Sequence, residues 1–398
     1  MRKVIASVLV MILVATSASI TSGQEADEKP PECELQFDGI LANESVHFQT
    51  SLGPRIPGSN ASFELRESLK SNLSGWEITE KNHYINGMNL TNLFATWNPE
   101  AGSEVILAAH YDTRHKADQD PNESRQDEPI LGANDGASGV AVLIELARHI
   151  PEMNLSHSVT LFFTDAEDQG DDHSTYIIGA RAWADNLSAE EAEKIESFVL
   201  VDMVGDSDLN LRKTYPGNDT LWNRTENIIR DIDDVCEINE SSYFDFEKKD
   251  GIYDDHVPAI EKGIPAIDII DTRYGEGAEY LGGYWHTHED TADKVSAESL
   301  EKVGLILEYG LRTGAWLNVR VNEETNIDSD GDGIIDLDDD CIDTWGEDEF
   351  GCPIDEIENK TEENNDIELY IRVAIICSLA LVLMIFVRLV YADNKGEG

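Results

Sequence analysis

The middle of the chain alternates between two patterns of hydrophobic positions. Short runs rich in β-branched and aromatic residues predict strands at 76–84, 90–97, 105–109, 159–164, 198–201 and 266–270. Apolar residues three or four positions apart predict helices at 63–73, 140–150, 175–186, 221–232, 257–262 and 300–316. Because the two patterns alternate, we expect an α/β fold, a three-layer sandwich around a central, mostly parallel, mixed β-sheet. Asn86 and Gly87 predict a tight turn between the first two strands.

A glycine-rich turn leads into the most regular of these helices. Within 131–148 (LGANDGASGVAVLIELAR), three glycines allow positive φ angles or the close approach of a neighbour. Ser138 is a candidate N-cap of the helix that follows. We therefore expect this turn to hold the carboxylate of Asp135 rigidly, as a metal ligand requires.

Polar residues follow directly on three of the predicted strands. His110 comes after the third strand, the acidic segment 165–168 after the fourth, and Asp202 after the fifth. In open α/β sheets, ligands bind beyond the carboxyl ends of the strands. We expect these side chains to meet at that edge, together with Asp135 and, from a later loop, His286.

This set of side chains predicts a zinc centre for one or two ions. With two ions, the ligands divide so that one ion is held by His110 and Asp202, the other by Asp168 and His286, with Asp135 as the bridge. His288 and Asp290, which follow the last ligand, are expected to be structural; support of the metal ligands from outside is the alternative.

Two further carboxylates are assigned to the chemistry. Asp112, two residues after His110, is placed to accept the second N–H of its imidazole and fix the tautomer. Glu167 lies next to a ligand and is free to act as a base that then returns the proton to the leaving group.

The same segments resemble the zinc exopeptidase family that includes bacterial leucine aminopeptidases and the glutaminyl cyclases. The resemblance rests on HYDT, GANDGASG, an acidic pair after an FF strand, DMVG, DDH and WHT, in that order. It implies a single catalytic α/β domain, placed here at 37–320, with the ligand roles given above. One departure is Asp168, where the family more often has glutamate, so that the metal would lie nearer the backbone.

Two details resemble the glutaminyl cyclase branch. Asp254–Asp255–His256 is similar to the Asp-Asp-His of the cyclases, and Trp285 to their pocket tryptophan. The resemblance implies that Asp254 acts in catalysis, paired with Asp202 and sharing a proton with it. The substrate pocket is then assigned to Trp285, Tyr284, Tyr280, Asp255 and His256. For the two tyrosines, ordinary packing is the alternative.

These features favour an enzyme that acts on peptide N-termini. We predict aminopeptidase-type hydrolysis by a zinc metallopeptidase, because that activity is the broader one in the family. The alternative is a glutaminyl-peptide cyclotransferase, which converts N-terminal glutamine to pyroglutamate and releases ammonia. A receptor or scaffold ectodomain without catalysis is disfavoured, because the chain keeps all five ligands and the base.

Charge and terminal segments predict a location outside the cell. The 398-residue chain has a net charge of −51, which argues against nucleic acid as a partner and for a surface in a salty medium. Segment 1–23 resembles a secretory signal peptide, and 24–36 is a linker. Segment 369–391 is long and apolar enough to cross a bilayer once, which leaves 392–398 as a cytoplasmic tail. Asn-x-Ser/Thr sequons from Asn43 onwards suit a glycosylated exterior.

A segment rich in aspartate and glycine, 326–353, precedes the predicted span. It places oxygen ligands at calcium-loop spacing, at Asp328, Asp330, Asp332, Ile334 (through its backbone carbonyl), Asp336 and Asp339. The run resembles a thrombospondin type 3 repeat, and we expect calcium to stiffen the stalk, which continues as an acidic segment at 354–368; a solvated acidic spacer is the alternative. Cys341 and Cys352 are expected to form a disulfide. Cys33 and Cys236 are a second candidate pair that the sequence does not require.

Overall fold

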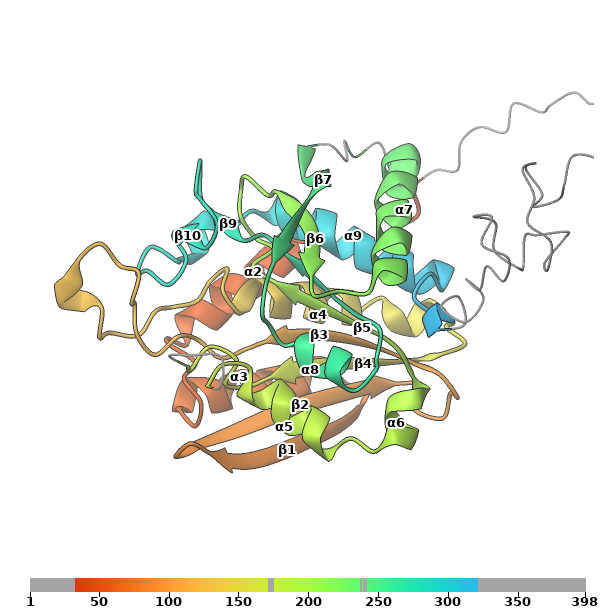
Figure 1. The fold of residues 1–398 in the computed structure, drawn as a ribbon, viewed down its shortest axis with the longest axis horizontal. Helices are drawn as coiled ribbons and strands as arrows, with labels where there is room; N and C mark the ends of the chain where they lie inside the picture. The colour runs from red at the N-terminus through yellow and green to blue at the C-terminus, as the bar shows by residue number, and fades with distance from the viewer. Residues whose placement is uncertain (1–32, 171–174, 237, 239–241, 321–398) are drawn as a thin grey trace, which may run out of the picture. The chain divides into compact units, whose positions relative to one another are not determined.

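A six-stranded mixed sheet forms the centre of the fold (Figure 1). The computed structural model describes residues 33–170, 175–236, 238 and 242–320. The strand order is β1-β2-β4-β3-β5-β8, with the bounds β1 (Glu77–Ile85), β2 (Met88–Trp97), β3 (Glu104–His110), β4 (Ser158–Thr164), β5 (Ile195–Asp202) and β8 (Ala266–Ile270). The pairs β1–β2 and β2–β4 are antiparallel, and the other three are parallel. The predicted mixed, mostly parallel sheet is confirmed.

Helices cover both faces of the sheet (Figure 1). Their bounds are α2 (Gly39–Ser51), α3 (Asn60–Asn72), α4 (Ala137–Ala147), α5 (Ile178–Asn186), α6 (Ala189–Lys194), α7 (Asp219–Cys236), α8 (Val257–Glu261) and α9 (Ala297–Thr313). Helix α4 packs on β3 and β5 with α2 and α9 behind it, whereas α5, α6 and α8 contact the sheet from the other side. Within the described residues, short 3₁₀ helices lie at Glu123–Arg125, Ile150–Glu152 and Ala292–Lys294. This arrangement is the three-layer sandwich that the sequence predicts.

The hairpin of β1 and β2 forms as predicted. Asn86 and Gly87 have φ angles of 52° and 83°, and the flanking residues Ile85 and Met88 pair directly. Positive φ at both central positions is the geometry of the two-residue turns that match the twist of a hairpin, and Asn-Gly adopts it readily.

Several elements were missed or misplaced by the hydrophobic pattern. Helices α2 and α6 were not predicted, and neither were the two-stranded sheets β6 (Leu211–Tyr215) with β7 (Phe244–Gly251) and β9 (Arg273–Tyr274) with β10 (Gly282–Gly283). Polar and apolar residues mix on α2, and its start is set instead by Asp38, whose side chain accepts hydrogen bonds from two backbone N–H groups. Helix α5 begins three residues later than predicted, because Ile177 is left-handed with φ 52°.

An aromatic core lies between the sheet and α5. Phe162 of β4 is fully buried and stacks on Phe94 of β2, with ring centroids 4.3 Å apart. Trp183 of α5 packs over the same ring at 5.4 Å. Each fully buried ring contributes about 1.5–3 kcal/mol through loss of water contact. This packing fixes β4, whose carboxyl end leads into the acidic segment.

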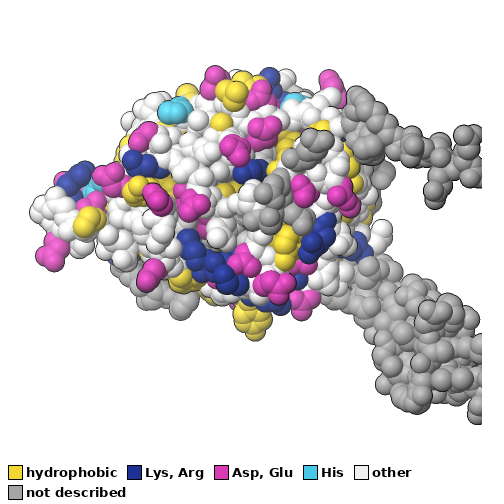
Figure 2. Space-filling view, turned by 90° about the horizontal axis from the view of Figure 1, so that it is seen from above, with side chains coloured by type: hydrophobic (Ala, Val, Ile, Leu, Met, Phe, Trp, Pro, Cys, Tyr) yellow, Lys and Arg dark blue, Asp and Glu magenta, His cyan; other side chains and the backbone are white. Residues whose placement is uncertain are grey.

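Cys33 and Cys236 form a disulfide that joins the start of the described chain to the end of α7. This candidate pair is therefore confirmed. The described residues include no helix long and apolar enough to cross a membrane. Acidic side chains are spread over the face shown in Figure 2, with fewer basic ones among them.

Several predictions fall outside the described residues. They are the signal segment 1–23, the calcium repeat 326–353 with Cys341 and Cys352, the stalk 354–368 and the span 369–391.

Candidate metal centre

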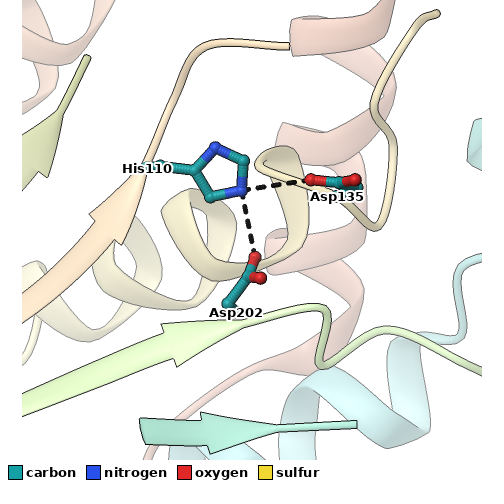
Figure 3. Close-up of side chains that lie close together, drawn as sticks. All are labelled: His110, Asp135 and Asp202. Atoms are coloured by element: carbon teal, nitrogen blue, oxygen red, sulfur yellow. Dashed lines mark hydrogen bonds and ion pairs between the residues drawn. The ribbon is translucent and has the colours of Figure 1, made fainter. Parts of the chain in front are cut away.

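Three predicted ligands meet at the carboxyl edge of the sheet and form what we call the His110 group. His110 ends β3, Asp202 ends β5, and Asp135 lies in the turn before α4. The Nε2 atom of His110 lies 3.2 Å from Oδ1 of Asp135 and 3.1 Å from Oδ1 of Asp202 (Figure 3). The β3–β5 register explains the meeting: Ala108 pairs with Leu200, so the ligand two residues later in each strand leaves the sheet at the same level.

A second set, the His286 group, shares Asp135 with the first. The Nε2 atom of His286 lies 3.5 Å from Oδ2 of Asp135 and 3.3 Å from Oδ1 of Asp168. Within each group, the candidate ligand atoms lie within 4.8 Å of one another, and all are buried. Asp135 turns one oxygen to each group, which is the division of ligands that the sequence predicts.

The unpaired atoms of these groups fit a cation. Oδ2 of Asp135 and Oδ2 of Asp168 are buried, and neither has a hydrogen-bond partner among the described residues. A buried carboxylate oxygen without a partner is costly. Imidazole nitrogen and carboxylate oxygen are usual ligands of zinc, and one bridging carboxylate suits a pair of ions. The residues present therefore fit the predicted metal.

The turn that carries Asp135 requires glycine. Gly136 has φ 98°, and a Cβ atom there would lie 2.7 Å from the carbonyl oxygen of Asp112 and 3.1 Å from Cε1 of His110. Helix α4 begins at Ala137 without a side-chain cap, so the prediction of Ser138 as its N-cap is wrong. Ser138 lies inside the first turn instead, and its hydroxyl donates to the carbonyl of Asn134 at 2.5 Å.

Asp290 holds the same turn from outside. Its carboxylate accepts the backbone N–H groups of Asn134 at 2.8 Å and Asp135 at 3.2 Å, and the hydroxyl of Tyr274 at 2.9 Å. Burial, followed by the charge of Asp135, raises the pKa of Asp290 to about 7. Asp290 thus supports the turn of a candidate metal ligand, which was the alternative to the structural role expected for it.

Asp112 joins the His110 group to the acidic segment. Its Oδ1 lies 3.5 Å from Nδ1 of His110 and accepts the backbone N–H of Glu167 at 3.0 Å. Its Oδ2 accepts the backbone N–H of Asp168 at 3.2 Å and the side-chain amide of Gln169 at 2.8 Å. Asp112 therefore lies beside the ring nitrogen it was predicted to face, and it also orients the backbone of the next two functional residues.

Glu167 lies between the two groups. Ala166 before it has φ 61°, and the Glu167 carboxylate lies 3.9 Å from Nδ1 of His110. Burial, followed by the charges of Asp254 and Asp168, raises the pKa of Glu167 well above its usual value. A carboxyl group with a raised pKa can both take and return a proton near neutral pH, as a general base requires.

A cluster of carboxyl groups extends behind the His110 group. Burial and then the charge of Asp202 raise the pKa of Asp254 well above its usual value. The sharing of a proton between Asp254 and Asp202 stays a prediction. Asp268, which was not predicted, is fully buried, and neither of its carboxyl oxygens has a hydrogen-bond partner among the described residues. Its pKa is also raised well above the usual value, by burial and then by Asp254.

A cavity of about 450 Å³ opens over both groups. Its floor is formed by carboxyl groups of the two groups with Glu167 and Asp254, and its wall by apolar and aromatic side chains that include Trp285, Tyr280 and Met203. Tyr280 donates a hydrogen bond to the carbonyl of Gly251 at 2.5 Å. Trp285 and Tyr280 thus line the cavity as predicted.

Three residues assigned to the pocket lie outside its lining. Asp255 is fully buried and accepts the hydroxyl of Thr164. His256 is also buried, and its Nε2 lies 2.8 Å from the carbonyl oxygen of Pro216. Tyr284 packs edge-on against Tyr274, with centroids 5.3 Å apart. These assignments are corrected: the turn after β7 points Asp254 into the cavity and its two successors into the core.

Two site residues were missed altogether. Asp118 Oδ1 lies 3.2 Å from Nδ1 of His286, and the buried Arg114 binds both Asp118 and the Oδ1 atom of Asp168. Both follow HYDT within five residues, but they lie in a loop without periodicity, so no local pattern marks them.

Comparison with known proteins gives one family match and many relatives. The model of peptidase family M28 matches residues 92–310. The glutaminyl-peptide cyclotransferase of Bothrops jararaca is 26% identical over 319 residues, which cover 69% of this chain and 82% of that protein. A solved Zn-dependent exopeptidase from Parabacteroides distasonis has a TM-score of 0.62 at 28% identity, over 70% of this chain and 98% of that one. Porphyromonas gingivalis glutaminyl cyclase has a TM-score of 0.60 at 30% identity, over 72% and 98%.

Proposed function

The chain belongs to peptidase family M28, a family of enzymes, and from that premise we propose that it is a zinc-dependent enzyme acting on the free N-termini of peptides. One observation carries the proposal. Two buried groups of His and Asp side chains share Asp135 at the floor of a cavity, with the carboxyl group of Glu167 beside them.

The cavity suits one N-terminal residue with its amine. No lysine or arginine is among the described residues that line it, whereas five carboxyl groups are. Such a floor attracts an ammonium group, and the wall of Trp285, Tyr280 and Met203 accepts an uncharged side chain. We therefore expect peptides with acidic N-terminal residues to be poor substrates.

We favour cyclisation of N-terminal glutamine as the reaction. A free α-amino group has a pKa of about 7.7–8.0 and must lose a proton before it can attack. Glu167 has a raised pKa, which matches it to that proton transfer better than an ordinary carboxylate would be matched. The relatives from Bothrops jararaca and Porphyromonas gingivalis are a glutaminyl-peptide cyclotransferase and a glutaminyl cyclase.

In this reaction the attacking amine and the departing ammonia both come from the substrate, so one bond forms and one breaks within it. The α-amine nitrogen bonds to the side-chain amide carbon, the bond from that carbon to the amide nitrogen breaks, and ammonia leaves. Glu167 takes the proton from the amine and delivers it to the departing nitrogen. A zinc ion held by Asp135, Asp168 and His286 would act as a Lewis acid on the carbonyl oxygen. Asp254 would keep its proton and donate a hydrogen bond to the substrate.

Hydrolysis of the first peptide bond is the second candidate. The observation that favours it is the His110 group, because a second ligand set sharing Asp135 matches the two-ion sites of aminopeptidases. Two solved relatives are a Zn-dependent exopeptidase and a leucine aminopeptidase precursor. In that reaction water is the nucleophile, and Glu167 serves it in the same way.

One assay separates the two reactions. The full-length chain is offered Gln-Ala peptides and leucine p-nitroanilide, each with and without a metal chelator. Ammonia without a free amino acid identifies the cyclase, and nitroaniline or free amino acid identifies the peptidase. If neither product appears after zinc is restored, the enzyme proposal fails and the scaffold alternative is favoured.

The proposal includes a location and a second metal. We propose that 1–23 directs export, that 369–391 anchors the chain, and that 326–353 binds calcium; the support for all three is sequence alone. Protease added to intact cells should release the catalytic domain. Calcium should slow cleavage within the stalk, and equal cleavage with and without calcium would refute the stalk role.

A further inference from the structure

The loop after β3 reaches the His286 group through one buried cation. The guanidinium of Arg114 donates to both carboxylate oxygens of Asp118, at 3.0 and 2.9 Å, in a two-pronged pair. Its remaining Nη1 donates to Oδ1 of Asp168 at 3.2 Å, to the backbone carbonyl of the same residue at 3.2 Å, and to the carbonyl of Gly170 at 2.7 Å. The planar guanidinium fork therefore sets the distance between one candidate ligand and a loop carboxylate.

Asp118 in turn contacts the other end of the group. Its Oδ1 lies 3.2 Å from Nδ1 of His286, and the next residue, Gln119, donates its backbone N–H to the carbonyl of His286 at 3.2 Å. His286 has φ 54°, a conformation that non-glycine residues rarely adopt and that the surroundings must hold in place. The loop thus holds both the ring and the backbone of this ligand.

The His110 group is supported by different contacts from those that Arg114 and Asp118 make with the His286 group. The Nδ1 atom of His110 lies 3.5 Å from Asp112, and Asp112 is held by two backbone N–H groups and an amide, not by a cation. The two groups therefore share Asp135 and the support of Asp112, which also accepts the backbone N–H of Asp168. Arg114 and Asp118 act on the His286 group.

We propose that Arg114 and Asp118 are positioning residues for the metal position formed by Asp135, Asp168 and His286. A carboxylate beside Nδ1 of His286 favours a proton on that nitrogen, which leaves the Nε2 lone pair free to bind the ion. Arg114 links Asp118 to Asp168, so that the two ligands are placed as one unit. This inference rests on the zinc role proposed above and adds to it a set of residues that act only through the ligands.

Zinc affinity is the direct test, because it does not depend on the reaction catalysed. The full-length chain is stripped of metal, and its zinc dissociation constant is measured by competition with a chelator. We expect Asp118→Asn to raise the dissociation constant by about 10- to 100-fold, the usual effect of losing such a partner of a metal-bound histidine.

Asp120→Asn is the matched control. Asp120 lies on the same loop two residues later and is also next to a histidine ring, with its Oδ2 2.8 Å from Nδ1 of His288, which belongs to neither ligand group. This change should alter the dissociation constant by less than about threefold. Equal effects of the two changes, or no effect of Asp118→Asn, would overturn the proposal.

Arg114→Lys tests whether the residues act as one unit. Lysine keeps the charge but cannot form the two-pronged pair. If Arg114 and Asp118 place the ligands together, the double variant should weaken zinc binding by less than the product of the two single effects. Fully independent effects would refute the linked brace.

Further measurements distinguish a loss of zinc affinity from a loss of the fold and from a failure of the proposed function. Melting temperatures of the zinc-saturated variants within a few degrees of the parent would show that the fold is intact. High free zinc should restore turnover to Asp118→Asn, as expected for lost affinity, and failure to do so would contradict a positioning role. If the unmodified chain binds no zinc, the proposed function and this inference both fail; if it binds zinc and Asp118→Asn binds it equally well, only the inference fails.

Discussion

The His110 group and the His286 group share a carboxylate but are built in different ways. His110 and Asp202 leave neighbouring parallel strands at the same level, so the sheet register places them. His286 lies in a loop and has φ 54°, and its partner Asp168 lies two residues after Ala166, which has φ 61°. One group is thus set by regular hydrogen bonding, and the other by contacts between irregular segments.

The surroundings of the two groups also differ in charge. Behind the His110 group lie carboxyl groups with raised pKa values, among them Asp254, Asp255 and Asp268. Beside the His286 group, Arg114 neutralises part of the negative charge, and the pKa of Asp118 is lowered despite its partial burial. The His110 group thus lies among carboxyl groups that hold their protons tightly. In the His286 group, burial raises the pKa of Asp168 to about 6, and His286 and Arg114 oppose that rise. Four changes test this contrast.

The largest effect is expected for Glu167→Gln. Glu167 lies between the groups and ligates in neither, so the change should lower kcat by about 10²- to 10⁴-fold, the usual contribution of a general base. Zinc content should stay that of the parent, because no candidate ligand is lost. Steady-state kinetics and metal analysis check both points, and unchanged turnover would remove the assignment of the base.

The second-largest effect is expected for Asp112→Asn, which should act differently on the two groups. Asp112 holds the backbone of Glu167 and Asp168, so we expect kcat to fall by about 10- to 100-fold, with a smaller change in the zinc dissociation constant. Asp118→Asn should show the reverse order of effects. If both variants change the same parameter to the same extent, the His110 group and the His286 group do not have distinct roles.

The pH dependence of protein stability should reveal the protons that the buried carboxyl groups bind. The pKa of Asp255 is raised by burial to about 7, above its unfolded value of about 3.9. The folded metal-free protein therefore binds this proton more tightly, and the stability that the raised carboxyl groups contribute falls as pH rises from about 4 to about 7.

We expect the metal-free protein to melt several degrees higher at pH 5.5 than at pH 7.5. Asp268→Asn, which replaces one of these carboxyl groups by a neutral amide of the same shape, should reduce the difference. Melting curves across this range check the prediction, and a higher melting temperature at pH 7.5 would contradict it.

Tyr280→Phe should have the smallest effect. It removes the hydrogen bond to the Gly251 carbonyl at the rim of the cavity, which is worth about 0.5–1.5 kcal/mol. We expect KM to rise by about two- to fivefold with kcat nearly unchanged. Tyr84→Phe, on a highly exposed residue of β1 outside the cavity, is the matched control and should change neither parameter.

The residues that converge here were predictable because their signals are local. His110, Asp202 and the acidic segment directly follow strand patterns, and Asp135 lies in a glycine turn before a helix. The carboxyl ends of parallel strands meet at one edge, so the position in the chain was enough to bring these side chains together. The hairpin turn at Asn86 and Gly87 was predictable for the same reason, since its φ angles depend on two residues alone.

Tertiary structure alone decided what surrounds these residues. Arg114, Asp118 and Asp268 act through partners distant in the chain, and no periodicity or turn signal marks them. The same applies to direction: Asp254 and Asp255 are adjacent, yet one faces the cavity and the other is buried against Thr164. Which residue types can bind a metal is a property of single side chains, whereas charge compensation and orientation arise only when separate segments pack together.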